Sequence, residues 1–375
     1  TGCSLAKADE MRRKMSKPNL KEEIEAYFKQ SSLARGYQLS VVNRVWQVLE
    51  GFGSFGFCKA HGAAFALPTY QSAWLKTHYP AEFIAGLLTH DPGMYPKRLL
   101  LAEARRLGVE LLPIDVNRST DEYRVEKTST SKGVRMAIGE IAGISTPEVS
   151  RIVRKAPFRD IADFYTRARP SRKTIMRLAA IGALDSLSEN ATRGDVIQKV
   201  REITTKPAPK VHSSQIELNF IIGEELPQGN PEFNRDQQLE QEVGLTGMDI
   251  SGHILDKYQS MLEDLGVCRS DELRTLRGNT EVLIAGVRVA TQTPPMRSGK
   301  RVVFISLDDG AGCADATFFD EAQARCSDLL FNNRLLLISG KLRRTGKNGV
   351  SVLAENAWDL NQLWIKWERG ERLAG

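Results

Sequence analysis

The sequence predicts an α+β protein with a mostly helical N-terminal part and a five-stranded barrel in its C-terminal part. Two patterns support this prediction. Apolar residues recur every three or four positions through much of the chain up to about residue 212, and from Thr280 onward one strand pattern follows another. The chain has 375 residues, of which 41% are hydrophobic. This is enough for two or three domains with cores of their own.

The helical part divides into several expected helices, some of which begin at prolines. They cover residues 4–50, 61–76, 80–88, 97–107 and 235–266, with short helices between 139 and 187. Three glycines between Gly51 and Gly56 predict a loop. Two alternating stretches, 123–126 and 134–138, predict short strands, and the Pro/Lys/Ser stretch 206–214 predicts a linker.

The C-terminal strands follow the order of an OB-fold, a small five-stranded barrel. They are expected at 281–291, 301–307, 313–319, 334–344 and 350–356. A helix from Glu321 to Leu330 is expected between the third and fourth strands, as in that fold. The pair Asp308 and Asp309 precedes Gly310, so we interpret it as a hairpin turn.

Charge is divided unevenly between the two parts. Residues 1–212 hold 34 Lys and Arg against 22 Asp and Glu, whereas residues 213–375 hold 18 against 24. A basic half predicts a polyanionic partner, although solvated helix faces would give the same excess. Five scattered cysteines and the absence of a long apolar run favour a reducing cytoplasm and no membrane partner.

Two segments near the N-terminus are candidate phosphate sites. Arg12 and Arg13 belong to a basic helical stretch whose charges repel one another unless an anion lies nearby. Further along, Lys59 and His61 follow the glycine-rich loop and precede a helix of small residues, whose N-terminus would attract phosphate. A solvated surface cluster and a packed histidine are the alternatives.

Two glycine turns, around Gly143 and Gly182, lie about forty residues apart in a basic region. Each resembles the hairpin of a helix-hairpin-helix unit, in which backbone N–H groups approach a DNA phosphate; the alternative is an ordinary helix cap. Nearby cations would add affinity without sequence preference. The candidate DNA-binding residues are Gly143, Ser145, Arg151, Arg154, Lys155, Arg172, Lys173, Arg177 and Gly182.

The barrel offers aromatic side chains for stacking on single-stranded bases: Phe304, Phe318 and Phe319. Phe318 and Phe319 are adjacent on a strand and face opposite sides, so at least one of them should belong to the core. The acidic balance of this half argues for weak binding. No strand carries an Asp-x-Asp pair, so no catalytic residue and no metal site is expected within the chain.

Several motifs together resemble the bacterial DNA polymerase III alpha subunit family, and the resemblance runs from about residue 2 to residue 360. The runs FGFCKAHGAAFA at 55–66, YQSAWLK at 70–76 and YPAEF at 79–83 resemble its fingers signature. The runs AD at 8–9, MRRKM at 11–15 and LPIDVNRS at 112–119 also match. Ala60 and Gly62 depart from the family, which usually has Ser and commonly Ala there, so a hydroxyl contact would be missing.

The resemblance implies the following regions: fingers over 1–120, helix-hairpin-helix units over 121–205, linker and helical connector over 206–278, OB-fold over 279–360 and a tail over 361–375. It implies that Arg12, Arg13, Lys59 and His61 lie near the triphosphate of an incoming dNTP. The catalytic carboxylates and Mg²⁺ would belong to a palm upstream of Thr1, so this chain alone would be inactive.

The run DPGMYPKRLL at 91–100 is similar to the error-prone members of the family. The implied function is therefore template-directed DNA synthesis from dNTPs during lesion bypass and DNA repair. Implied partners are primer-template DNA, dNTP, the sliding clamp and translesion accessory proteins. A fragment of a replicative alpha subunit and a stand-alone, non-catalytic DNA-binding protein remain the alternatives.

Overall fold

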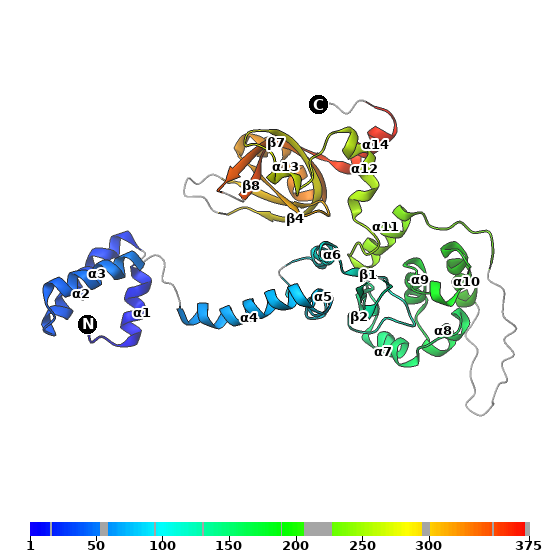
Figure 1. Cartoon of the computed structure of the whole chain (residues 1–375), viewed down its shortest axis with the longest axis horizontal. Helices are drawn as coiled ribbons and strands as arrows, with labels where there is room; N and C mark the ends of the chain where they lie inside the picture. The colour runs from blue at the N-terminus through cyan, green and yellow to red at the C-terminus, as the bar shows by residue number, and fades with distance from the viewer. Residues whose placement is uncertain are drawn as a thin grey trace. The chain divides into compact units, whose positions relative to one another are not determined.

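The computed structural model describes residues 1–371 except 16, 53–58, 94, 130, 189, 206–226, 295–300 and 347–348. The chain forms two compact units, Thr1–Trp74 and Leu75–Gly375, and Figure 1 labels most of their helices and some of their strands. The predicted linker and most of the predicted glycine-rich loop lie outside the described residues. Among the described residues, no helix is long and apolar enough to cross a membrane.

The first unit contains helices α1 (Leu5–Lys14), α2 (Pro18–Ala34) and α3 (Leu39–Phe52). Helix α1 begins at Ser4, whose hydroxyl accepts the backbone N–H of Lys7. Ile24, Val42 and Trp46 are buried between α2 and α3. Helix α4 (Lys59–His78) crosses the boundary between the units.

The second unit begins with α5 (Pro80–His90) and α6 (Lys97–Arg106), which pack against a small sheet. Its strands are β1 (Glu110–Leu112), β2 (Arg124–Lys127) and β3 (Lys132–Arg135), in the order β1-β3-β2. Strand β3 is parallel to β1 and antiparallel to β2. The predicted short strands are therefore present, within a few residues of their expected positions.

The helical layer that follows the sheet shares its core. It contains a 3₁₀ turn (Ile138–Glu140) and the helices α7 (Thr146–Lys155), α8 (Ile161–Ala168), α9 (Arg172–Ala180), α10 (Arg193–Thr205) and α11 (Arg235–Thr246). One continuous cluster of buried residues joins α5, the sheet and this layer, with Phe164, Ile175 and Leu178 fully buried. Helices α7 and α9 therefore have a rigid support.

The predicted helix over 235–266 is interrupted. Gly247 has φ +72 and ends α11 in a left-handed cap, as glycine does more readily than other residues. The chain resumes a helical course only with a 3₁₀ turn (Ile254–Tyr258) and α12 (Gln259–Asp264). A second 3₁₀ turn, Glu272–Arg274, precedes the barrel.

The barrel closes in the order β4-β5-β6-β8-β7. Its strands are β4 (Glu281–Gln292), β5 (Val303–Asp308), β6 (Cys313–Phe318), β7 (Leu335–Thr345) and β8 (Gly349–Asp359). Helix α13 (Asp320–Asn332) lies between β6 and β7 in the chain, and a short parallel pairing of β6 with β8 completes the closure. The predicted OB-fold order is confirmed, and α14 (Leu360–Glu368) follows the last strand.

Candidate nucleic-acid interface

The first glycine turn precedes α7. Gly143 is exposed and has φ +73, and no group in the described part of the chain accepts a hydrogen bond from its N–H. The Arg177 guanidinium from α9 lies over this turn, where it donates to the carbonyl of Ala142. A Cβ built at position 143 would lie 2.6 Å from Arg177 Nη1. The turn therefore presents a free backbone donor beside a cation, an arrangement suited to one phosphate.

The second glycine turn ends α9. Gly182 has φ +83, and its N–H donates to Ala179 O at 3.1 Å. The N–H of Ala183 donates to Leu178 O at 2.8 Å, which completes a Schellman cap. Both donors are satisfied within the helix end. The structure places Gly182 as a cap, with no backbone N–H free at 182 or 183 for a phosphate.

A buried carboxylate joins the segment after the first turn to the beginning of α9. Glu148 Oε1 accepts the N–H of Ser171 at 2.8 Å, and Oε2 accepts the Ser145 hydroxyl at 2.8 Å and its N–H at 3.3 Å. Burial alone would raise the pKa of Glu148, but these hydrogen bonds and one from Thr174 lower it to about 2. The candidate Ser145 thus uses its hydroxyl hydrogen within the fold.

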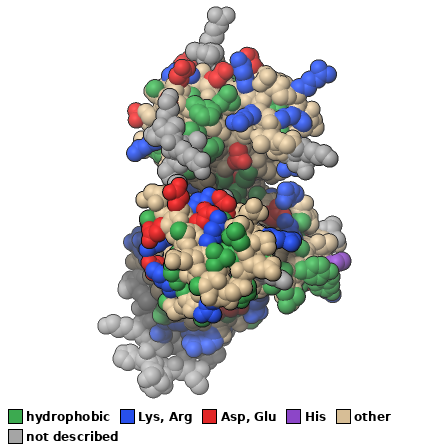
Figure 2. All heavy atoms as spheres, turned by 90° about the vertical axis from the view of Figure 1, so that its left-hand side faces the viewer, with side chains coloured by type: hydrophobic (Ala, Val, Ile, Leu, Met, Phe, Trp, Pro, Cys, Tyr) green, Lys and Arg blue, Asp and Glu red, His purple; other side chains and the backbone are tan. Residues whose placement is uncertain are grey.

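The candidate cations fall into two groups. Arg151 donates to the carbonyls of Ala168 and Arg169, and Lys155 donates to that of Arg167, so both cap the end of α8. In contrast, Arg154, Arg172 and Lys173 are exposed, and their side chains have no hydrogen-bond or ion-pair partner among the described residues. Basic and acidic side chains are interspersed on the face that Figure 2 presents.

Arg172 and Lys173 are the first two residues of α9, and no acidic residue occupies its first turn. The positive end of the helix dipole repels cations in the first turn, so both side chains are placed unfavourably unless an anion lies nearby. We therefore regard the exposed cations Arg154, Arg172 and Lys173, with Arg177 and Gly143, as the candidate nucleic-acid interface.

Comparison with known proteins agrees with this geometry. Residues 108–194 match the family described as a helix-hairpin-helix motif, which covers both glycine turns. Residues 282–360 match the family described as an OB-fold nucleic acid binding domain. The chain therefore carries two domains of nucleic-acid-binding type.

The relatives are polymerases. An error-prone DNA polymerase of Symbiobacterium thermophilum is 30% identical over 88% of this chain and 35% of that protein. The DNA polymerase III subunit alpha of Vibrio cholerae is 28% identical over 99% of this chain and 33% of its own length. An error-prone DNA polymerase of Bdellovibrio bacteriovorus is 29% identical over 90% of this chain and 34% of that protein. The chain belongs to the bacterial DNA polymerase III alpha subunit family. It spans about a third of the length of these relatives.

The residues expected near a triphosphate in this family are only partly described. Arg12 and Arg13 are exposed on α1, and each pairs with Asp9, at 2.9 Å and 2.8 Å. The hydrogen bond from Arg12 lowers the pKa of Asp9. The anion that the basic cluster requires is thus supplied by its own helix. His61 is exposed with its ring against Phe65, and the side chain of Lys59 lies outside the described residues.

The aromatic candidates of the barrel separate by exposure. Phe304 is 38% exposed and Phe319 is 44% exposed, so both rings are accessible to a base. Phe318 is fully buried in the barrel core, so its assignment as a stacking residue was wrong. The reason is strand alternation: Phe318 points inward with Ala316 and Ala314.

Sequence reasoning missed a buried ionic cluster between α6 and the barrel. Arg98 Nη2 lies 3.2 Å from Asp249 Oδ2 and 3.4 Å from Asp308 Oδ2. His253 Nδ1 accepts the N–H of Leu255, and its Nε2 lies 3.3 Å from both Asp308 Oδ2 and Arg98 Nη2. Asp308 was interpreted as a turn residue, but it is the last residue of β5 and is buried. Asp249 within the apolar run Met248 to Ile250 was the available signal.

The converging buried carboxylates of the described residues do not fit a Mg²⁺ site. Among the described residues, no three His, Cys, Asp or Glu side chains are placed to hold a metal ion. The two buried aspartates that converge, Asp249 and Asp308, already face Arg98 and His253. A cation would have to displace the guanidinium to bind there.

Proposed function

We propose that this chain is the DNA-gripping part of an error-prone DNA-directed DNA polymerase that acts in lesion bypass and DNA repair. In this proposal the helix-hairpin-helix region holds the duplex of the primer-template and the barrel meets single strands. Nucleotidyl transfer would depend on Mg²⁺ held by carboxylates in the remainder of the enzyme. The observation that carries the proposal is the free N–H of Gly143 beside Arg177, within a region that matches a helix-hairpin-helix motif.

The contact we infer is electrostatic and independent of sequence. A phosphate at Gly143 would accept the backbone N–H and meet the Arg177 guanidinium, while Arg154, Arg172 and Lys173 would meet neighbouring phosphates. For the nucleotide we propose Arg12, Arg13, Lys59 and His61, on the strength of the family resemblance alone. The sliding clamp and translesion accessory proteins are proposed partners on the same basis.

A replicative role has support from a specific observation, because the relatives include DNA polymerase III alpha subunits at 28% identity. The error-prone role is preferred because the run at 91–100 is similar to those members. Lesion bypass by the full-length enzyme on a template with an abasic site would separate the two roles.

The test of the proposed function uses the purified chain with a fluorescent primer-template, dNTPs and Mg²⁺. We expect binding to duplex without sequence preference, with a log-log salt slope of about −0.9 for each phosphate neutralised, and no primer extension. Processive incorporation by the chain alone would show that it holds a complete catalytic centre. Salt-independent binding, or no binding, would contradict the DNA-gripping role.

A further inference from the structure

A hollow of about 720 Å³ lies where α6 meets the barrel, and we call it the arginine hollow. Arg105 and Arg106 line it from α6, and Arg269 and Arg274 line it from the segment that precedes β4. The turn between β5 and β6 and the beginning of β8 complete its walls. The hollow is therefore built from four separate stretches of the second unit.

The lining of the arginine hollow is cationic. Its four arginines face two aspartates, Asp271 and Asp315, which leaves a net charge of two positive. The ion pair between Arg269 Nε and Asp271 Oδ1 is long, at 3.6 Å, and both side chains are more than half exposed. An ion pair between two exposed side chains of this kind is weak. Within the described residues, the exposed Arg274 side chain has no partner.

Glu103 forms an ion pair with Arg106, and Asp309 lies in the turn between β5 and β6, so the cations left for a ligand are Arg269 and Arg274. The thiol of Cys313 lines the hollow, and burial, together with nearby aspartates, raises its pKa to about 11, so it is neutral at pH 7. The N–H groups of Gly310, Ala311 and Gly312 already donate to Asp308 and Asp309. Recognition of an anion would therefore come from guanidinium groups rather than from the turn.

The walls are held in place by buried contacts. Arg105 Nη2 donates to the carbonyls of Ile250 and Gly252, and Asp309 accepts both the N–H and the hydroxyl of Ser270. The Arg98 and Asp308 contact fixes α6 against β5. Because the scaffold is fixed without a ligand, binding would require little reorganisation of the backbone.

We propose that the arginine hollow binds phosphate groups of a single nucleic-acid strand. Guanidinium groups suit phosphate oxygens, and Arg269 and Arg274, five residues apart on the segment before β4, suit successive phosphates of one strand better than one isolated anion. The inference rests on the proposed function and adds a site to it. Phe304 and Phe319 lie at the opposite end of the β5–β6 hairpin, because Asp308 pairs with Cys313 while Phe304 pairs with Thr317.

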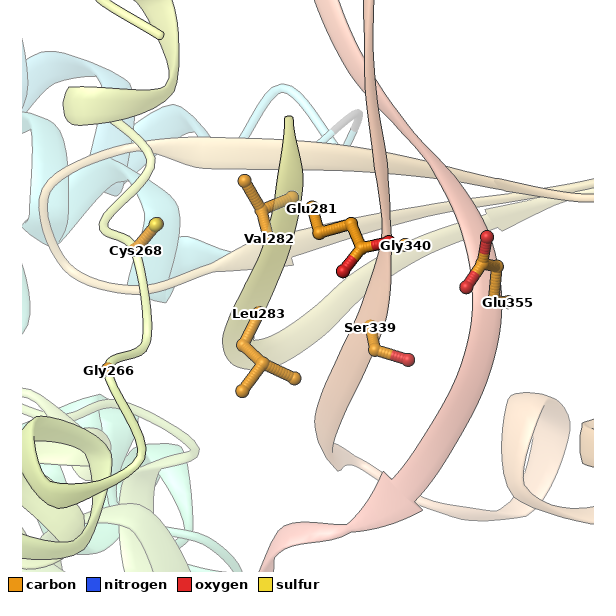
Figure 3. A pocket seen from close by; sticks show the side chains of 8 residues that line it. All are labelled: Gly266, Cys268, Glu281, Val282, Leu283, Ser339, Gly340 and Glu355. Atoms are coloured by element: carbon orange, nitrogen blue, oxygen red, sulfur yellow. The ribbon is translucent and has the colours of Figure 1, made fainter. Parts of the chain in front are cut away.

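A second hollow on the barrel shows by contrast what this site requires. It measures about 420 Å³ and presents Glu281 and Glu355 from β4 and β8, with Cys268 on the segment that precedes the barrel (Figure 3). It has no arginine in its lining. We call it the glutamate hollow, and it would repel a phosphate, so it serves as an internal control.

The first experiment compares two double variants of the whole chain with a fluorescent oligothymidine. Arg269→Ala with Arg274→Ala removes two charges from the arginine hollow. Lys366→Ala with Arg369→Ala removes two exposed charges from α14 and its C-cap, which follow the far end of β8. We expect about a tenfold loss of affinity only in the first variant. Its log-log salt slope should become shallower by about 1.4, or 0.7 for each of two phosphates.

Equal affinities and equal slopes in the two variants would overturn the proposal while leaving the DNA-gripping function intact. An unaltered chain that binds no DNA would instead contradict the proposed function itself. A parallel binding measurement with sodium tripolyphosphate distinguishes a nucleic-acid strand from a free polyphosphate as the ligand. If the arginine variant loses tripolyphosphate binding but keeps its affinity for oligothymidine, the site takes a free polyphosphate and the proposal fails.

The second measurement needs no variant and therefore does not depend on folding of a mutant. Excess oligothymidine should slow alkylation of Cys313 in the arginine hollow at least severalfold, and leave that of Cys268 in the glutamate hollow unchanged. Peptide mapping by mass spectrometry gives both rates in one sample. Equal rates for Cys313 with and without the oligonucleotide would contradict occupancy of the hollow.

Discussion

The two glycine turns of the helical layer follow the same sequence pattern, yet their hydrogen bonds differ. At Gly182 the chain folds back, and the N–H groups of Gly182 and Ala183 both donate to carbonyls of α9. At Gly143 the chain instead runs on to the first residues of α7, which leaves one N–H without an acceptor among the described residues. The difference lies in the direction of the chain after the glycine. A glycine turn becomes a phosphate site only when the helix does not use its donors.

Glu148 allows the largest test of this comparison, because it connects Ser145, just after the first turn, with Ser171, where α9 begins. Its folded pKa is lowered, so its contribution to stability is complete above the unfolded value near 4.5 and is lost as the pH falls toward 2. We expect Glu148→Gln to lower the free energy of unfolding at pH 7 by roughly 2 kcal/mol.

Urea unfolding of both proteins between pH 7 and pH 3 checks this expectation. The difference between the two proteins should shrink as the pH falls through the window from about 5 to 2. A constant difference across that range would mean that the charge of Glu148 does not hold the two helices together.

The two glycines themselves give a matched pair. Gly182→Ala forces a Cβ into a left-handed residue, 2.1 Å from Arg193 Nη2, and should lower stability by about 1–2 kcal/mol with normal DNA affinity in the folded protein. Gly143→Ala has the same backbone strain, but it also displaces Arg177.

We therefore expect only Gly143→Ala to weaken duplex binding, by severalfold, when anisotropy is measured below the melting temperature of each variant. If Gly182→Ala weakens binding equally, the second turn is a phosphate site as well, and the distinction between the turns fails.

The smallest expected effect on stability concerns the cations at the beginning of α9. Replacement of Arg172 and Lys173 by Ala should leave the melting temperature unchanged or raise it slightly, because the helix dipole disfavours them there by a few tenths of a kcal/mol each. Duplex affinity should fall, and the salt slope should become shallower by about 1–2. A lower melting temperature with an unchanged salt slope would mean that Arg172 and Lys173 stabilise the fold and do not contact DNA.

Much of the fold could be predicted because it depends on local pattern. The five strands and α13 lie within a few residues of their expected positions, since alternation and hairpin glycines are visible in the sequence. The break at Gly247 was missed because the apolar spacing continues past it. Only the left-handed cap shows where α11 ends.

The candidate site was harder to predict, because chemistry at a site depends on which partners are near. Arg151 and Arg154 look alike in sequence, yet Arg151 caps α8, while the Arg154 side chain has no hydrogen-bond or ion-pair partner among the described residues. The same holds for Phe318 and Phe319, because Phe318 ends β6 with its ring in the core whereas Phe319 follows the strand as the N-cap of α13 and is exposed. The contact of Arg98 with Asp308 joins residues 210 positions apart, and no spacing rule reaches so far.

The contact of Arg98 with Asp308 also limits how the barrel can be exchanged during evolution. OB-folds are common modules, and recombination could replace one by another of the same strand order. A substitute without an acid at the end of its second strand would leave Arg98 buried against Asp249 alone and would remove the contact of Asp308 with His253. Barrels that bring an aspartate or a glutamate to that position should be tolerated. The buried Arg98 of the helical part thus requires one carboxylate from any barrel that follows it.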